Sequence, residues 1–527
     1  MTGVSRGIDR IEAIFDDPSL VANAELVVPA TLMARLGLEE LINQTVRLVG
    51  RIGGSRPGRK VLTLVSAILA GGSHIDHANV LRSGATRAVL PCRVMAPSTL
   101  GTFLRSFTFG HVRQLDAVIA EALRRAWQLG AGPSEDTMTI DMDSTVCEVH
   151  GHQKQGAAYG YAGTLGYHPL LATCAETGEV LHARLRKGSS QRGAKRFIEE
   201  LVARLRQAGA PAAMCLRADS GFWSHALIDT LARLGAGWSI TVTINPAIRA
   251  VIEAIDNDAW TPIAYPTGGE AAVAETTYTP GRGSRRRSYG LVVRRSRLTD
   301  SAQQALWPDW RYHAFVTSSV ADTVSADRFH RDHARVELAI RDLKEGAGLE
   351  HCPSGRFFAN AAWLACAVVA HNLIRWTDQL GGTRHGDQLT VARTVRARVL
   401  ALRGRLVNRS GSGRPTLRLP ATGPGPTRSP SPSAGSATSP WSPDQRPADR
   451  RGRRRPPRAD NPNKPETPSS TRPNTTPRAP PRSDSIIRPT TAQPRKPIGG
   501  PRLNAEGRRV PGDRGHLLAC CVPSQRG

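Results

Sequence analysis

Thr137–Val146, which reads TMTIDMDSTV, is the stretch of sequence that decides the fold. Its polar and apolar residues alternate, and this pattern predicts a β-strand, because successive side chains of a strand point to opposite faces. Asp141 and Asp143 are two residues apart, so we expect both carboxylates on the same face of that strand. Two acidic side chains on an otherwise apolar strand are candidates for a functional site; an edge strand that meets solvent is the alternative.

The segments that follow alternate between strand and helix patterns. Three strand patterns come first, then a helix, a strand, a helix and a strand. This order predicts an α/β fold with a mixed sheet, arranged as in a ribonuclease H-like core. A stretch rich in Thr, Tyr, Gly and Arg interrupts the core, and we expect it to form a β-rich insertion. The expected segments are a core at 131–244 and 311–380, the insertion at 245–310, strands at 137–146, 167–174, 179–185, 214–219, 238–244 and 313–317, and helices at 194–205, 224–234 and 326–345.

The regions on either side of the core have different characters. Residues 1–130 read as short helices with Gly-containing turns and exposed arginines, which suits a helical N-terminal DNA-binding domain; a helical bundle that only packs is the alternative. Residues 381–420 are predicted to hold a basic helix at 390–406 and to complete the fold. Residues 421–527 contain 22 of the 38 prolines and 20 Lys and Arg against 7 Asp and Glu, which predicts a disordered basic Pro/Arg-rich tail.

The chain is strongly basic, with 71 Lys and Arg against 44 Asp and Glu and a formal net charge of +27. An excess of positive charge points to a polyanionic partner, of which nucleic acid is the most common. Arg285, Arg286 and Arg287 form a basic loop that we expect to hold the DNA backbone. A solvated loop, and a basic surface without any partner, are the alternatives.

Several protein classes are not expected. The longest apolar run, 361–374, is shorter than a membrane span and contains His371 and Asn372. The first residues lack the apolar core of a signal peptide, and the eight cysteines show no C-x-x-C spacing. We therefore expect a cytoplasmic protein without membrane association, disulfide framework or zinc ribbon.

Asp219 and Glu337 add carboxylates from two further elements. Asp219 ends a short predicted strand just before a helix, and side chains at such strand ends gather at one edge of an open α/β sheet. Glu337 lies inside a predicted helix. Converging with Asp143, the three carboxylates could hold Mg²⁺ or Mn²⁺ for phosphoryl transfer, because these ions prefer oxygen ligands. Taken singly, Asp219 also suits a turn or helix cap, and Glu337 also suits an ion pair with Arg341.

The helix that contains Glu337 is predicted to have one polar face. Four side chains recur along it at helical spacing: His330, His333, Glu337 and Lys344. Apolar residues occupy the opposite face, so we expect these four to point away from the core. Such a face presents one carboxylate flanked by groups that contact phosphates; a solvated helix surface is the alternative.

Three ordered motifs resemble those of an insertion-sequence transposase of the Asp-Asp-Glu (DDE) type, in the IS-thirteen-eighty family. They are Ile140–Thr145 (IDMDST) with Gly151–Gln153 after it, Leu216–Phe222 (LRADSGF), and Glu337-x6-Lys344. The resemblance covers about residues 25–420. It implies a ribonuclease H-like catalytic core with a β-rich insertion between the second Asp and the Glu.

The resemblance also implies roles for single residues. Asp143, Asp219 and Glu337 are implied to be the catalytic metal ligands, and Lys344 to contact a DNA phosphate near the cut. Asp143 is preferred to Asp141, which would be a supporting or spare ligand, because the resemblance places the catalytic residue directly before Ser or Thr. The signature helix of the family reads Tyr-x2-Arg-x3-Glu-x6-Lys. His330 and His333 stand at its Tyr and Arg positions, where they would contact DNA.

The implied function is that of a transposase. It would bind the terminal inverted repeats of its element, cleave the ends and join them to target DNA, acting as a homodimer in the DNA complex. We expect it in the cytoplasm, associated with the nucleoid. Two alternatives stay open: a catalytically inactive DNA-binding protein, such as a decayed transposase or a repressor, and a ribonuclease H-like nuclease that only cleaves. The tail is either a frameshift product or a genuine basic arm.

Overall fold

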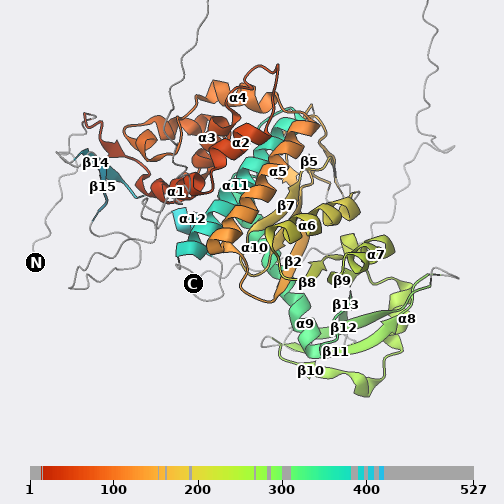
Figure 1. The fold of residues 1–527 in the computed structure, drawn as a ribbon. Helices are drawn as coiled ribbons and strands as arrows, with labels where there is room; N and C mark the ends of the chain where they lie inside the picture. The colour runs from red at the N-terminus through yellow and green to blue at the C-terminus, as the bar shows by residue number, and fades with distance from the viewer. Residues whose placement is uncertain are drawn as a thin grey trace, which may run out of the picture. The chain divides into compact units, whose positions relative to one another are not determined.

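A mixed β-sheet organises the part of the chain that this computed structural model describes, namely residues 14, 16–151, 153–160, 163–188, 193–265, 269–281, 286–298, 310–381, 390–396, 402–408 and 415–420 (Figure 1). The predicted tail, 421–527, lies outside the described residues. Within them the main sheet has the strand order β10-β11-β12-β13-β9-β8-β2-β6-β7. The bounds are β2 Thr137–Ser144, β6 Leu170–Cys174, β7 Val180–Arg184, β8 Ala213–Ala218, β9 Gly237–Val242, β10 Thr261–Ile263, β11 Gly269–Tyr278, β12 Tyr289–Leu298 and β13 Arg311–Thr317. The predicted mixed α/β fold is confirmed.

Strand β2 lies inside this sheet, where its alternating sequence predicted a strand. It pairs antiparallel with β6 and parallel with β8, and β8 pairs parallel with β9. Met138, Ile140 and Met142 are buried and share one face of β2, so Asp141 and Asp143 belong to the other face. Because β2 and β8 run in the same direction, their carboxyl ends lie at the same edge of the sheet.

Two helices make the connections between the parallel strands. Helix α6 (Ala194–Ala208) leads from β7 to β8, and helix α7 (His225–Arg233) leads from β8 to β9. The side chain of Ser224 accepts a hydrogen bond from the Leu227 backbone N–H at 3.3 Å and so caps the start of α7. Both helices occur where the apolar spacing of the sequence predicted them.

The region expected to be an insertion extends the same sheet. It begins with helix α8 (Pro246–Glu253), and its strands β10, β11 and β12 form an antiparallel series. Strand β13 pairs antiparallel with both β12 and β9 and therefore joins this series to the rest of the sheet. The predicted β-rich character is present, but the strands are continuous with the main sheet.

The N-terminal helices share a core with the sheet. They are α1 Val27–Arg35, α2 Leu38–Thr45, α3 Pro57–Leu69, α4 Pro97–Arg105 and α5 Phe109–Ala126. Helix α11 (Phe357–Gly381) contacts α1, α3, α4 and α5 as well as strand β7, and Figure 1 shows it running beside α5. In the described part of the chain, α11 is the one helix long and apolar enough to cross a membrane, but 94% of its apolar window is buried inside the protein. Its apolar surface is therefore used for packing.

The end of the described chain differs from the predicted basic helix at 390–406. Helix α12 covers only Ala392–Val395, and strand β14 (Gly404–Asn408) follows it. Strand β14 pairs with β1 (Leu20–Val21) and with β15 (Pro415–Arg418) in a separate three-stranded sheet. Leu406 and Leu417 pack against buried Val21. Pairing with a strand from the start of the chain overrides the local helical spacing, which was a wrong guide here. A third sheet contains β3 (Cys147–Glu148), β4 (Ala158–Tyr159) and β5 (Leu165–Tyr167).

Candidate active site

Asp143 and Asp219 lie at the carboxyl ends of neighbouring parallel strands. Met142 of β2 is opposite Ala218 of β8, and each Asp directly follows its member of this pair. The Ser144 backbone N–H donates to Asp143 Oδ1 at 2.6 Å, and the Gly221 N–H donates to Asp219 Oδ1 at 3.1 Å. The predicted cap role of Asp219 is present together with its place beside Asp143.

Glu337 reaches the same edge of the sheet from a helix. It lies on α10 (Arg335–Arg341), which contacts β2, and its side chain is exposed. Asp143, Glu337 and Lys344 line one pocket of about 290 Å³, together with Ser144, Thr145, Ile340, Arg341, Glu345 and Glu350. The structure thus brings Glu337 and Lys344 to Asp143, as the sequence motifs predicted.

The carboxylates at this edge influence one another electrostatically. Burial raises the pKa of Asp143 to about 6, and the negative charges of Asp219 and Glu337 add to the effect; the Ser144 N–H and His333 oppose it. Partial burial also raises the pKa of Asp219, against the Gly221 N–H and His333. A divalent cation relieves such repulsion between neighbouring carboxylates.

The predicted continuous helix 326–345 is broken. Helix α9 (Thr323–Arg331) is followed by a 3₁₀ turn (Asp332–Ala334), then by α10 and a π-helical turn (Asp342–Gly346). Each change of helix type shifts the direction in which later side chains point. The four polar residues expected on one face therefore have different surroundings.

His330 is buried, so the expectation that it contacts DNA phosphate is wrong for this structure. Its Nδ1 is 2.8 Å from Ser239 Oγ, its Nε2 is 3.0 Å from Thr241 Oγ1, and its ring stacks on Phe315 with centroids 4.0 Å apart. Burial, with nearby positive charges, lowers the pKa of His330 to about 2. A neutral ring enclosed by β9 and β13 stabilises the packing of α9 and offers no cation to a phosphate.

His333 is half-buried and contacts a carboxylate. Its Nδ1 is 2.9 Å from Asp141 Oδ1. Arg217 binds the same carboxylate with both arms of its guanidinium, Nε to Oδ1 at 2.7 Å and Nη2 to Oδ2 at 2.9 Å. Arg217 also donates from Nη1 to the Phe329 carbonyl, which ties β8 to the end of α9. Both carboxylate oxygens of Asp141 thus already have partners, which suits the supporting role expected for it.

Arg217 is a site residue that the sequence analysis did not assign. It is buried on strand β8, two residues before Asp219. A guanidinium inside a sheet requires an acidic partner, because an unpaired buried charge is costly. The arginine within LRADSGF, and the second acid within IDMDST, were the available signals for this pair.

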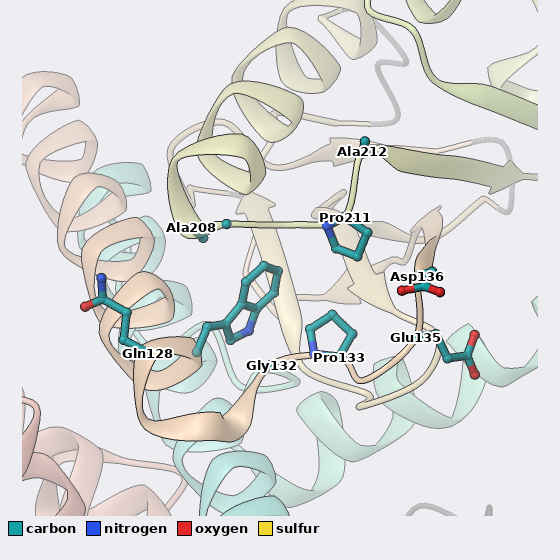
Figure 2. Close-up of a pocket in the computed structure, with 10 residues that line it drawn as sticks. Gln128, Gly132, Pro133, Glu135, Asp136, Ala208, Pro211 and Ala212 are labelled. Carbon is teal, nitrogen blue, oxygen red and sulfur yellow. The ribbon is translucent and has the colours of Figure 1, made fainter.

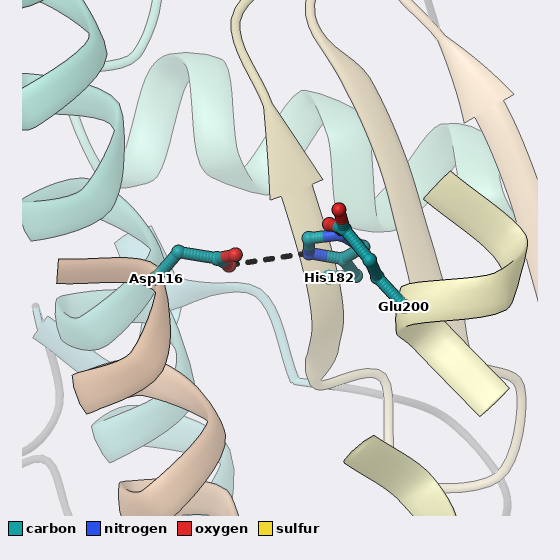
Figure 3. A group of neighbouring side chains, drawn as sticks. All are labelled: Asp116, His182 and Glu200. Carbon is teal, nitrogen blue, oxygen red and sulfur yellow. Dashed lines mark ion pairs between the residues drawn. The ribbon is translucent and has the colours of Figure 1, made fainter. Parts of the chain in front are cut away.

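A second group of potential metal ligands lies elsewhere. Among the described residues, Asp116, His182 and Glu200 are the group whose donor atoms all lie within 4.8 Å of one another (Figure 3). They come from α5, β7 and α6, respectively. Their carboxylates already form ion pairs with arginines: Arg113 and Arg204 with Asp116, and Arg113, Arg184 and Arg196 with Glu200.

The charges of this second group favour an ion-pair network over a metal site. Although burial opposes the effect, His182 and the arginines lower the pKa of both Asp116 and Glu200. A cation bound there would be repelled by the surrounding guanidinium groups. The network joins α5, β7 and α6, and it could not be predicted from sequence because its members share no motif.

The pocket drawn in Figure 2 lies at the opposite ends of strands β2 and β8 from Asp143 and Asp219. Its volume is about 420 Å³, and Trp127, Pro133, Asp136 and Pro211 are among its lining residues. Its walls precede Thr137 and Ala213, which pair at the amino ends of β2 and β8. The two Asp side chains are at the carboxyl ends, so this pocket is separate from the candidate site.

The basic loop of the insertion is only partly described. Arg285 lies outside the described residues. Arg286 and Arg287 are exposed, and Arg287 Nη1 is 3.1 Å from Asp229 Oδ1 on α7. One of the two described arginines is thus already paired with an acid.

Fold and site together define a mixed α/β protein whose acidic side chains gather at the carboxyl ends of two parallel strands and an adjacent helix. Over residues 6–425 the chain matches Transposase DDE domain group 1, and it belongs to this family of DNA transposases. Among solved structures it is similar to the piggyBac transposase synaptic complex with hairpin DNA, with 12% identity and a TM-score of 0.37 over 72% of this chain and 80% of that chain. A comparison with curated proteins gives no match.

Proposed function

We propose that this transposase cleaves the ends of its element and joins them to target DNA, with Asp143, Asp219 and Glu337 as catalytic metal ligands. The observation that carries the proposal is the position of the two Asp residues at adjacent parallel strand ends, with Glu337 lining the same pocket as Asp143. In the strand order β7-β6-β2-β8-β9, the strand that comes first along the chain, β2, lies between the second, β6, and the fourth, β8. This order supports a ribonuclease H-like core.

The donor set suits Mg²⁺ or Mn²⁺. All three proposed ligands are carboxylates, and that of Glu337 is exposed. Burial, with the negative charges of Asp219 and Glu337 adding to it, raises the pKa of Asp143 to about 6, so a divalent cation competes with a proton there. Bound at this site, metal ions would supply Lewis-acid activation of an attacking oxygen and stabilisation of the leaving one.

The protein's own groups have supporting roles in this proposal. The Ser144 N–H orients the Asp143 carboxylate, and Lys344 places a positive charge in the pocket where a DNA phosphate would lie. Asp141 and Arg217 hold His333 beside the two Asp residues. Of the two histidines His330 and His333, only His333 is placed to contact a DNA phosphate, because His330 is enclosed.

The wider parts of the proposal follow from the same sequence motifs. We propose binding to the terminal inverted repeats, a homodimer in the DNA complex, membership of the IS-thirteen-eighty family, and a place at the nucleoid in the cytoplasm. Arg286 and Lys344 are proposed contacts to the DNA backbone, with Arg285 and Arg287 as further candidates in the same loop.

One assay separates this function from the alternatives. Purified protein is incubated with Mg²⁺, a labelled duplex carrying the terminal repeat, and a target plasmid. Joined products support a transposase, and cleaved but unjoined products support a nuclease that only cleaves. A gel shift without any product, with and without metal, supports a catalytically inactive DNA-binding protein. Ca²⁺ in place of Mg²⁺ is the control and should permit binding without turnover.

A further inference from the structure

A pocket lined with arginines lies in the N-terminal helical part and has no role in the site described above. Its volume is about 760 Å³. Its lining comes from α2, α3, the 3₁₀ helices Ile75–Arg82 and Thr86–Val89, and the loop that leads to α4. Four arginines belong to it: Arg59, Arg82, Arg87 and Arg93. We call it the arginine pocket.

The positive charge of the arginine pocket is largely uncompensated. Glu39 is the one carboxylate among its lining residues, and it pairs with Arg59 at 3.0 Å. Arg82 donates from Nη1 to the neutral Asn79 side chain at 3.1 Å. Arg82, Arg87 and Arg93 are exposed and have no acidic partner within the lining. Three of the four lining arginines thus have no carboxylate within the lining to balance their charge.

The backbone that presents these arginines is anchored. The Met95 N–H donates to Thr63 Oγ1 at 3.2 Å, and the Cys92 thiol is 3.8 Å from the Arg59 carbonyl oxygen. These contacts hold the loop that carries Arg93 against α3, the helix that carries Arg59. Leu81 and Thr86 are buried beside Arg82 and Arg87. A fixed backbone lowers the entropy cost of binding an anion in the pocket.

We propose that the arginine pocket holds phosphate groups of the backbone of bound transposon-end DNA. A guanidinium presents a planar fork that matches phosphate oxygens, and several such groups on a fixed surface position a duplex without reading its sequence. This inference rests on the proposed function, because it requires that the chain binds DNA. It adds a second DNA contact, built from elements that do not carry the carboxylates.

The test replaces three arginines in the full-length protein: Arg82→Gln, Arg87→Gln and Arg93→Gln together. Binding to a terminal-repeat duplex and to an unrelated duplex is measured by fluorescence anisotropy over a range of salt concentrations. We expect affinity to fall by about tenfold or more for both duplexes, and the slope of log K against log salt to become shallower by about 2 to 3. A matched control, Lys195→Gln, Arg233→Gln and Arg249→Gln, removes the same charge from α6, α7 and α8 and should change affinity by less than about twofold.

Other results would contradict the proposal. Equal affinity and slope in the arginine-pocket variant and the control variant would show that the pocket does not contact DNA. Calorimetric binding of inorganic phosphate that only the arginine-pocket variant loses, with DNA affinity unchanged, would make it a site for a small anion. An unchanged thermal midpoint and unchanged Mn²⁺ binding establish that the variant is folded. A wild-type protein that binds neither duplex overturns the proposed function as well, whereas normal wild-type cleavage with an unaffected variant overturns this inference alone.

Discussion

At the scale of single residues, Asp143, Asp219 and Glu337 are expected to be needed for chemistry and dispensable for DNA affinity. Asp143→Asn, Asp219→Asn and Glu337→Gln should each lower the cleavage rate by a factor of about 100 or more, while DNA affinity stays within about twofold, because backbone contacts supply the affinity. Cleavage of labelled DNA and anisotropy measure the two properties. Glu345→Gln is the matched control, since Glu345 lines the same pocket without a proposed role. A normal rate in Asp143→Asn would remove that residue from the site.

The raised pKa of Asp143 predicts a pH dependence of metal binding. With a pKa of about 6, the side chain is ionised above that pH and protonated below it. A metal ion must displace the proton in acid, so Mn²⁺ affinity should fall by up to about tenfold per pH unit below pH ~6 and level off above it. Calorimetric titrations with Mn²⁺ across this range measure the effect. Asp143→Asn should bind Mn²⁺ more weakly and with a flatter pH profile; a parallel profile would assign the titration to another group.

The pairing of Asp141 with Arg217 predicts strong coupling in stability. Both side chains are almost fully buried, at 1% and 3% exposure, and the contact is bidentate. Asp141→Asn or Arg217→Gln alone leaves one buried charge unpaired, so each should cost about 3 kcal/mol or more, and the double variant should lose much less than the sum. Chemical denaturation of the four proteins gives the coupling energy. The exposed pair Glu199 and Arg233 is the control, with an expected coupling below about 1 kcal/mol. Additive losses for Asp141 and Arg217 would contradict a mutual role.

At the scale of elements, Glu179 links three of them. Trp127, in the turn after α5, donates a hydrogen bond from its Nε1 to the Glu179 carboxylate at 2.8 Å. Trp376, on α11, donates from its Nε1 to the same carboxylate. Glu179 itself directly precedes β7. No basic side chain is among these partners. Burial raises the pKa of Glu179 from 4.5 to about 7, with the two tryptophans and Thr177 opposing the shift. The folded protein therefore prefers the protonated carboxyl.

This preference predicts a loss of stability with rising pH. A folded-state pKa above the unfolded value gives stability that is full below pH 4.5 and is lost as pH rises through about 7. The loss should be of the order of 3 kcal/mol in the free energy of unfolding. Glu179→Gln should remove most of this dependence, whereas the exposed Glu199→Gln should retain it. Urea denaturation at several pH values measures the effect, and identical pH profiles for Glu179→Gln and wild type would contradict it.

The same scale shows what the sequence could predict. Strand 137–146 and helix 194–205 have strong periodicity and occur in the structure as β2 and α6 with nearly the same bounds. The helix expected at 390–406 was wrong, because pairing of β14 with β1 depends on residues nearly the whole described chain away. The 3₁₀ turn at Asp332–Ala334 contains no Gly or Pro to mark it. Its effect on His330 could not be read from spacing alone.

Site residues divide in a similar way. Asp143 and Asp219 could be expected at one edge of the sheet from sequence, because both lie at strand ends and the order of strand and helix patterns predicts an α/β sheet. The contact between Asp141 and Arg217 could not, because it depends on the register of two strands 76 residues apart. Site roles for Asp143, Asp219, Glu337 and Lys344 remain predictions that the variants above test.

At the scale of the whole molecule, the chain after Pro420 is expected to be dispensable for catalysis. Within the described residues the last strand, β15, ends at Arg418. A protein truncated after Pro420 should keep its thermal midpoint and most of its cleavage activity. It should lose non-specific DNA affinity, since the removed segment contains 20 Lys and Arg against 7 Asp and Glu. Calorimetry, cleavage and anisotropy on the truncated protein measure these properties. Complete loss of cleavage in a folded truncated protein would show that the tail takes part in the reaction.

The continuous nine-stranded sheet determines how the described part of the molecule responds to force. The ladder between β9 and β13 runs from Val242 opposite Ala314 to Ser239 opposite Thr317, and it is the backbone link between the insertion and the core strands. A force applied along β9 and β13 loads all the hydrogen bonds of this ladder in shear at the same time. The ladder therefore withstands a larger force than one whose hydrogen bonds open one by one. DNA held at the insertion would therefore transmit tension through β9 to β8, the strand that Asp219 directly follows. We therefore expect the insertion strands and the core strands to unfold together under load, and a single-molecule pulling experiment should record one rupture event.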